Sequence, residues 1–353
     1  MSDPDFARVL TALRRAQPDR VPLGEVSVDP EVKDAFLGRP VVGVEDEVEF
    51  WVQAGFDHIA IDTDLYAAPV IQDRIVRALE NTAHGYAGAR HDRGWVGSAA
   101  AVIRNREDVQ RFAWPRAEDV DLSIYQKLPS VLPPSMKAVV TIGHVFTGAW
   151  QLMGFESFCV SLIEDPDLVL EITDRLGRET LRLLDRVLAQ EVVGAVCLQD
   201  DIAYTNGLMV SLPMLRRIFF PWLTTAVERV HLAGRPVFLH SDGDVLQAIP
   251  DLLRCGIDGL HPIEPKCMDI AAVKRQYGDR LALLGNLDLG YTMTRGTPAE
   301  VRQAVRELMR DVAPGGGYLL GSANSITNYV PLENFQAMLA AGREFGRYPI
   351  SLR

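Results

Sequence analysis

Three apolar runs in the second half of the sequence each end in polar residues that could carry chemistry. These residues are His240 and Asp242, His261 and Glu264, and Asn286 and Asp288. Imidazole and carboxylate groups serve enzymes as acids, bases and metal ligands. Helix-like stretches separate the runs, which predicts parallel strands whose carboxyl ends meet at one edge of a sheet. The sequence therefore predicts a single polar site at that edge.

Other predicted strands end in polar residues in the same way. The further candidates for the site are Glu25, Asp64, His144, Asp201, Tyr204 and Asn324. Asp200 and Asp201 are adjacent, and neighbouring side chains on a strand point to opposite faces. We therefore expect Asp201, with Tyr204 nearby, to face the site. The alternative is that Asp200 and Asp201 form a helix-capping pair. His240 could also be a hydrogen-bonded structural histidine, and a structural role is the preferred interpretation for His261.

The order of apolar and amphipathic stretches indicates about eight strand–helix units, which favours a closed (β/α)8 TIM barrel of the α/β class. We expect a single domain over residues 1–353 with an N-terminal helical extension. Strands are expected at 20–28, 57–64, 137–143, 193–201 and 318–326, besides the three runs described first. Helices are expected at 3–16, 29–38, 45–54, 150–162, 165–190, 212–233 and 331–345. Residues 80–104 should form an excursion over the barrel mouth, and residues 106–136 a connection.

Composition narrows the class of protein. The chain has 353 residues and a net charge of −11, which argues against binding to nucleic acids or anionic membranes. The sequence contains no apolar run of membrane-spanning length, and its first residues do not form a signal segment. The four cysteines have no CxxC spacing, so neither a disulfide framework nor a zinc ribbon is indicated. We expect a cytoplasmic location.

Six short motifs, taken together, resemble the uroporphyrinogen decarboxylase superfamily. They are Pro18–Pro22, Ala54–Asp57, His240–Gly243, Gly285–Asp288, Gly296–Val301 and Val330–Asn334. The motifs span nearly the whole chain in the order that the superfamily shows. The resemblance implies a (β/α)8 barrel and one of two activities. One is the cofactor-free decarboxylation of uroporphyrinogen III, and the other is methyl transfer involving a corrinoid or a thiol, often with zinc.

The sequence agrees with the decarboxylase branch in one feature and differs from it in three. Asp64 falls where that enzyme has its essential aspartate. The arginine-rich segment that should follow Pro22 is replaced by an acidic stretch that includes Glu25. Phe155 stands where that enzyme has a tyrosine, and Asn324 stands where it has a histidine. Because a substrate with eight carboxylates requires cationic partners, decarboxylation is the alternative interpretation rather than the favoured one.

The methyltransferase branch is favoured, with an altered metal site. Zinc-containing members show His-x-Cys and a later cysteine, where this chain has His240 with Asp242, and Asn324. Such a harder donor set would suit activation of an oxygen atom, as in demethylation of a methoxy group. Glu25 is a candidate ligand from across the barrel. Zinc is the candidate metal, with His240, Asp242 and Glu25 as ligands.

We therefore expect methyl transfer from a small O-, N- or S-methyl compound to a corrinoid carried by a partner protein. A homodimer is a candidate assembly, and a catalytically silent binding protein is a third class of function. The expected catalytic residues are His240, Asp64 and Asp201. The residues expected to bind substrate are Glu25, Tyr204, Asn286, Asp288, Asn324 and His144.

Overall fold

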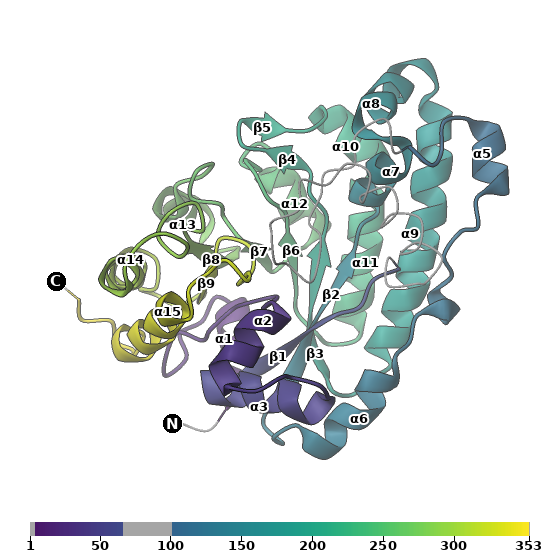
Figure 1. Ribbon diagram of the computed structural model, residues 1–353. Helices are drawn as coiled ribbons and strands as arrows, with labels where there is room; N and C mark the ends of the chain where they lie inside the picture. The colour runs from purple at the N-terminus through teal and green to yellow at the C-terminus, as the bar shows by residue number, and fades with distance from the viewer. Residues whose placement is uncertain (1–3, 66–100, 353) are drawn as a thin grey trace.

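A parallel sheet forms the centre of the molecule (Figure 1). The structure, a computed structural model, describes residues 4–65 and 101–352. Seven parallel strands pair in the order β1-β2-β3-β6-β7-β8-β9. Their bounds are β1 His58–Asp62, β2 Lys137–Gly143, β3 Val193–Gln199, β6 Val237–His240, β7 Gly259–His261, β8 Ala282–Leu287 and β9 Tyr318–Ser322. The short strands β4 Ala203–Tyr204 and β5 Gly207–Leu208 form a separate antiparallel hairpin. The prediction of an α/β fold with a parallel sheet is confirmed.

The predicted first strand, residues 20–28, is not a regular strand, but it runs beside β9. Gly24 donates its backbone N–H to the carbonyl of Leu320 at 2.7 Å, and the N–H of Leu320 donates to Pro22 at 2.9 Å. Isolated parallel bridges join Leu23 to Leu320 and Val28 to Ile326. This segment continues the curled sheet beyond β9. Closure into an eight-stranded barrel stays a prediction.

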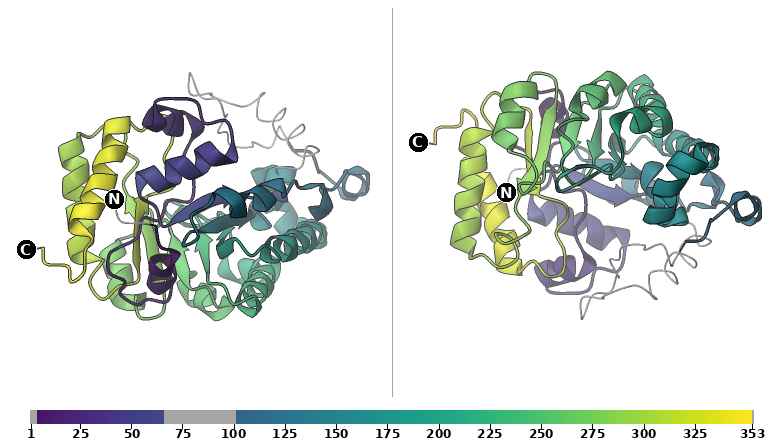
Figure 2. Two further views of the ribbon diagram at one scale, coloured as in Figure 1. Left: turned by 90° about the horizontal axis from the view of Figure 1, so that it is seen from below. Right: turned by 90° about the horizontal axis from the view of Figure 1, so that it is seen from above.

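Helices surround the sheet (Figure 2). Those that precede β3 are α1 Phe6–Leu13, α2 Pro30–Leu37, α3 Val44–Ala54, α5 Arg106–Arg111, α6 Ser123–Val131, α7 Phe146–Met153, α8 Phe155–Glu164 and α9 Pro166–Leu188. Those that follow β3 are α10 Leu212–Ile218, α11 Phe220–Leu232, α12 Ile249–Cys255, α13 Ile270–Tyr277, α14 Pro298–Asp311 and α15 Leu332–Phe345. No helix in the described ranges is both long and apolar enough to span a membrane.

Three predicted segments differ from the structure for local reasons. Residues 106–136 are not a plain connection, because they contain α5 and α6. The helix expected over 150–162 is two helices that meet at Gly154, whose φ of 73° interrupts the helical path. The helix expected over 212–233 is also two, because Pro221 lacks the N–H that a continuous helix would require. Most of the predicted excursion at 80–104 lies outside the described residues.

The inner face of the sheet is apolar at one end. Val139, Phe238 and Leu319, on three different strands, form a buried cluster with Phe6 and Leu13 of α1. The fit of α1 against the sheet is close: a Cβ atom at Gly194 would lie 2.4 Å from the Phe6 ring. The expected N-terminal helical extension is therefore part of the core, where it fills the space beneath the sheet.

The next inner positions along the same strands are polar. Thr141 lies two residues beyond Val139, and His240 lies two residues beyond Phe238. The remaining side chains, which point outward, pack in the larger core against the helices, as Ile59 and Ile61 of β1 do. Because side chains alternate along a strand, the inner face becomes polar toward the carboxyl ends of the strands.

If α1 is part of this core, its largest apolar residue should be expensive to remove. We predict that Phe6→Ala lowers the free energy of unfolding by about 3–5 kcal/mol, because Phe6 is buried and leaves a cavity. Chemical denaturation measures this change. The control is Val42→Ala, since Val42 is exposed. A loss no larger than that of the control would show that α1 does not belong to the cooperative core.

Candidate active site

Three ligand atoms face one another at the polar end of the sheet. His240 is the last residue of β6, Asp242 follows it, and Asp201 follows β3. The Nε2 atom of His240 lies 3.9 Å from Oδ1 of Asp201 and 3.8 Å from Oδ1 of Asp242. These separations are too long for hydrogen bonds. All three ligand atoms lie within 4.8 Å of one another, which is a spacing that a single metal ion could bridge.

Neighbouring groups hold the two carboxylates in place without satisfying them. Asn324 donates from Nδ2 to Oδ2 of Asp242 at 2.7 Å, and the backbone N–H of Asp242 donates to Asp201 at 3.0 Å. Oδ1 of Asp242 is buried and has no hydrogen-bond partner among the described residues. Burial, followed by the charges of Asp201 and Glu264, raises the pKa of Asp242 to about 8. A bound cation would relieve this crowding.

The imidazole of His240 is buried against a second histidine. Burial lowers the pKa of His240, so its neutral form, which binds metals, is favoured. Nδ1 of His240 lies 2.7 Å from Nδ1 of His261, its partner in the β6–β7 register. One proton must lie between these nitrogens. If Nε2 of His240 is to be a ligand, Nδ1 carries its proton and donates it to His261.

The residues of this group fit a divalent metal ion. One imidazole nitrogen and two carboxylate oxygens are ligands that zinc and harder divalent ions accept. Asp201, which was expected to be catalytic, belongs to this group with His240 and Asp242. Glu25 lies outside it, because its two oxygens accept hydrogen bonds from the N–H and the hydroxyl of Ser322 at 2.5 and 2.9 Å. The metal-ligand role of Glu25 stays a prediction.

A polar cavity of about 210 Å³ adjoins His240. Its polar lining includes Ser27, Asp62, Thr141, Gln199, Asn324 and His240. Asp62 pairs in register with Thr141 on the neighbouring strand, and Gln199 pairs in register with His240. These four residues come from four adjacent strands, and the strand register places their side chains side by side along one wall of the cavity. A second cleft, of about 290 Å³, contains Asp242, Asn324 and Asp288.

Asp64 and His144 form an ion pair after β1 and β2. Oδ2 of Asp64 lies 2.5 Å from Nδ1 of His144. Burial alone would lower the pKa of His144, but the Asp64 carboxylate outweighs that effect and raises it to about 10. Asp200 has a structural role: it accepts the N–H groups of Val145, Phe146 and Thr147 and so caps α7. Of the predicted capping pair, Asp200 is therefore confirmed as a cap, on α7, which precedes it in the chain, whereas Asp201 accepts the N–H of Asp242.

The other three candidates make local contacts. Tyr204 packs its ring against Phe155, with 5.6 Å between ring centroids. Asn286 donates a hydrogen bond to the carbonyl of Ile263. Asp288 accepts the N–H groups of residues 290–292 and so stabilises that turn. Substrate binding by Tyr204, Asn286 and Asp288 stays a prediction.

Sequence reasoning missed several residues that line the cavity. Asp62, Thr141 and Gln199 were not among the candidates, although each stands within a predicted strand. Asp62 could have been found by alternation, because it lies two residues before Asp64 and therefore on the same face of the chain. Thr141 and Gln199 are ordinary residues of apolar strands and give no such signal.

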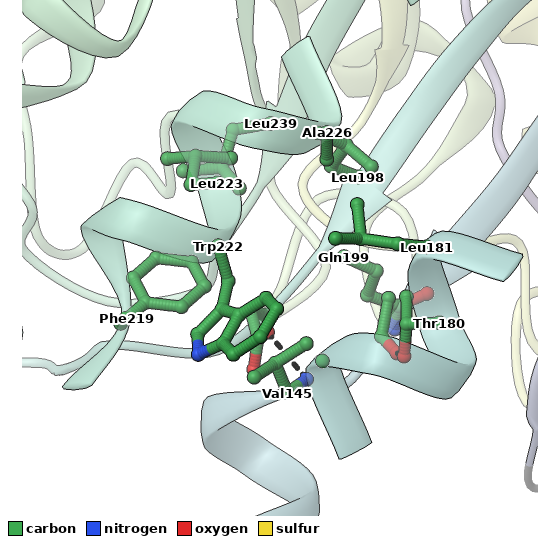
Figure 3. Close-up of a pocket in the computed structure, with 13 residues that line it drawn as sticks. Val145, Thr180, Leu181, Leu198, Gln199, Phe219, Trp222, Leu223, Ala226 and Leu239 are labelled. Atoms are coloured by element: carbon green, nitrogen blue, oxygen red, sulfur yellow. Dashed lines mark hydrogen bonds between the residues drawn. The ribbon is translucent and has the colours of Figure 1, made fainter. Parts of the chain in front are cut away.

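A separate pocket between the sheet and the helices is too small to be the site. Its volume is about 30 Å³, which leaves room for about two water molecules at ~10–15 Å³ each. Figure 3 shows Phe219 and Trp222 along one wall and Thr180 and Leu181 along the other. Trp222 lies against Gly177 of α9, where a Cβ atom would be 2.4 Å from the indole ring. This pocket is a gap in helix packing.

The sequence model of a known family matches most of the chain. The family is described as Uroporphyrinogen decarboxylase (URO-D), and the match covers residues 97–345. The chain belongs to the uroporphyrinogen decarboxylase family.

Curated relatives include a methyltransferase and a decarboxylase. The methylcobamide:CoM methyltransferase MtaA of Methanosarcina barkeri is 32% identical over 240 residues, which are 65% of this chain and 67% of that protein. The uroporphyrinogen decarboxylase of Coxiella burnetii is 24% identical over 262 residues, or 69% and 68% of the two chains. A solved methyltransferase from Methanosarcina mazei superposes with a TM-score of 0.70 at 20% identity, covering 96% of this chain and 98% of that one. The likeness to the solved structure shows the shared fold.

If His261 orients His240, removing its ring nitrogens should weaken metal binding while the ring packing is retained. We predict that His261→Phe lowers the affinity for zinc by about 10–100-fold, the usual effect of losing a group that orients a ligand. Isothermal titration of the metal-free protein measures this affinity. The control is His231→Ala, since His231 pairs with Asp258 away from the site. Unchanged affinity in a folded His261→Phe protein would contradict the orienting role.

The Asp64–His144 pair should stabilise the fold in a pH-dependent way. The folded pKa of His144, about 10, lies above the ordinary value of about 6.5. Its contribution is therefore complete below about pH 6.5 and is lost as the pH rises toward 10. We predict that His144→Asn, which tolerates the positive φ of this position, costs about 3–5 kcal/mol at low pH. Denaturation of both proteins across this range should show the difference shrinking; a constant difference would contradict the ion pair.

Proposed function

We propose that this protein is a methyltransferase of the uroporphyrinogen decarboxylase family that takes a methyl group from a small O-, N- or S-methyl compound. The acceptor is a corrinoid carried by a partner protein. The observation that carries the proposal is the convergence of His240, Asp201 and Asp242 beside a small polar cavity. The MtaA relative of Methanosarcina barkeri, a methylcobamide:CoM methyltransferase, supports methyl transfer that involves a corrinoid, although its name gives the corrinoid as the methyl donor.

The size of the cavity favours a small substrate. Its volume of about 210 Å³ lies below the ~300–1,000 Å³ that is usual for ligand pockets. A compound of a few heavy atoms would fill it, whereas a tetrapyrrole with eight carboxylates is far larger. No lysine or arginine is among the residues of the described ranges that line the cavity, so it lacks the cations that such a substrate requires.

The protein groups have separate roles in this proposal. His240, Asp201 and Asp242 would hold a divalent ion, with zinc as the candidate. Once bound, such an ion would act as a Lewis acid that polarises the heteroatom carrying the methyl group. Asn324 fixes the Asp242 carboxylate, and His261 fixes the His240 ring. Gln199 offers an amide to polar atoms of the substrate.

Decarboxylation of uroporphyrinogen III is the second candidate, because relatives with that activity align over 68% of their length. Asp64 stands where the essential aspartate of that enzyme falls. In this structure, however, its carboxylate pairs with His144. Asn324 replaces the expected histidine and donates to Asp242, and Phe155 packs against Trp150 at 6.0 Å between rings. These contacts favour the methyltransferase over the decarboxylase.

His240 provides the direct test of the proposed function. We predict that His240→Ala removes most of the bound metal and lowers methyl transfer to reduced cobalamin by about 100-fold, with the fold intact. Elemental analysis measures the metal, and visible spectroscopy measures transfer from a panel of methanol, methylamines, methyl ethers and dimethyl sulfide. His231→Ala is the matched control. A folded His240→Ala protein that keeps both metal and activity would refute the metal site.

The alternative has its own test. We predict that the purified protein does not convert uroporphyrinogen III to coproporphyrinogen, because the cavity is small and lacks cationic lining in its described part. Chromatography of the porphyrin products measures this conversion. Turnover by the wild-type protein that disappears in Asp64→Asn would reverse the assignment in favour of the decarboxylase.

A further inference from the structure

We propose that Asp62 and Thr141 form a subsite for a protonated amine, so that the methyl donor is a small N-methylated ammonium compound. This inference rests on the proposed methyl transfer and names the class of its substrate. It is carried by the residues that face the cavity on the β1–β2 side, away from the group around His240.

Several carboxylates at the polar end already have partners. Those with partners are Asp64 with His144, Asp200 with the first N–H groups of α7, Glu25 with Ser322, and Asp242 with Asn324. Asp201 accepts the N–H of Asp242 and faces His240. Asp62 lines the cavity, and within residues 4–65 and 101–352 its carboxylate has neither a side-chain hydrogen bond nor an ion pair.

The second, independent observation is the hydroxyl of Thr141. Thr141 is 5% exposed and lines the same cavity. Apart from the sulfur of Cys197, to which its hydroxyl can donate, its Oγ1 atom has no hydrogen-bond partner in the described chain. Asp62 and Thr141 are register partners on adjacent parallel strands, which lie about 4.8 Å apart. A carboxylate and a hydroxyl oxygen at this spacing can accept two N–H groups of one ammonium ion.

The subsite carries a negative charge at neutral pH. Asp62 is exposed to the cavity, and partial desolvation by the surrounding protein raises its pKa to about 6, with Asp64 adding to the shift and His144 opposing it. Asp62 is therefore ionised at neutral pH. The nearby His144 imidazolium is compensated by Asp64, and Thr141 across the β1–β2 pairing is neutral. No lysine or arginine of the described chain lines the cavity. This subsite attracts a cation and repels an anion.

A protonated amine also suits the chemistry of the transfer, because its proton already makes the nitrogen a leaving group. An ammonium nitrogen has no lone pair to offer a metal ion, so with this donor the ion proposed at His240 would not polarise the nitrogen. The bond between carbon and nitrogen breaks, and its electron pair stays on nitrogen. The methyl group is taken by an electron pair of the acceptor, which in the proposed function is a reduced corrinoid. The amine leaves as a neutral molecule that retains its proton. Asp62 stays ionised throughout, and its role is to hold the N–H group so that the leaving amine remains protonated until the bond breaks.

Methylammonium and methanol are the probes, because they have nearly the same shape and differ in charge. NMR titration of each into the metal-free wild-type protein near neutral pH measures binding. We expect methylammonium to bind about tenfold more tightly or better, as a charge-assisted hydrogen bond predicts. Asp62→Asn should abolish this preference and leave methanol binding unchanged. Asp279→Asn, which removes one exposed charge outside the cavity, should preserve it.

Two further variants keep the test decisive if Asp62→Asn fails to fold. Asp62→Glu retains the charge and should retain the preference for methylammonium, and Thr141→Val should weaken methylammonium binding severalfold. Equal affinity for the two probes in the wild type would overturn the inference, as would a preference that survives in folded Asp62→Asn or an unchanged affinity in Thr141→Val. Zinc binding by the Asp62 variants should equal that of the wild type. The metal site could therefore stand even if the ammonium subsite does not.

Discussion

The alternation of side chains along parallel strands in a common register is the constraint on which the rest of this structure depends. At one level of the inner face, Val139 and Phe238 pack against Phe6 of α1. Two residues further along the same strands, Thr141 and His240 line a cavity. The apolar base and the polar site are therefore consecutive layers of the same strands. A slip of one residue in any strand would exchange its inner and outer side chains and disrupt both layers at once.

Concentrating carboxylates at one end of a sheet is costly unless each is stabilised. Asp200 is stabilised by the amide groups of α7, and Asp64 by His144. The exceptions are informative, because Oδ1 of Asp242 has no partner among the described residues and the carboxylate of Asp62 faces a cavity. Groups that stability alone does not explain are the ones expected at a functional site.

Membership of the uroporphyrinogen decarboxylase family does not by itself settle the reaction, since the relatives of this chain include a methyltransferase and decarboxylases. The shared fold supports both chemistries, so function has to be argued from the residues at the strand ends. In this chain Asn324 donates a hydrogen bond to Asp242. His240, Asp201 and Asp242 form a group of three possible metal ligands. The metal-capable group is therefore made from a histidine and two aspartates of neighbouring strands.

The sequence by itself determined the parallel α/β architecture, most of the helices and strands, and the polar character of the strand ends. These features follow from hydrophobic patterns that are local in the chain. It also placed His240, Asp242 and Asp201 at adjoining strand ends, which the structure brings together.

Only the tertiary structure decided which polar groups meet. Glu25, for example, accepts hydrogen bonds from Ser322, which lies 297 residues later in the chain. Thr141 lines the cavity because it is the register partner of Asp62 on the neighbouring strand. Breaks between helices, such as the one at Gly154, also came from the structure. The physical reason is that strand register and side-chain pairing join distant segments, and a local pattern of apolar residues carries no information about which distant residue will stand opposite.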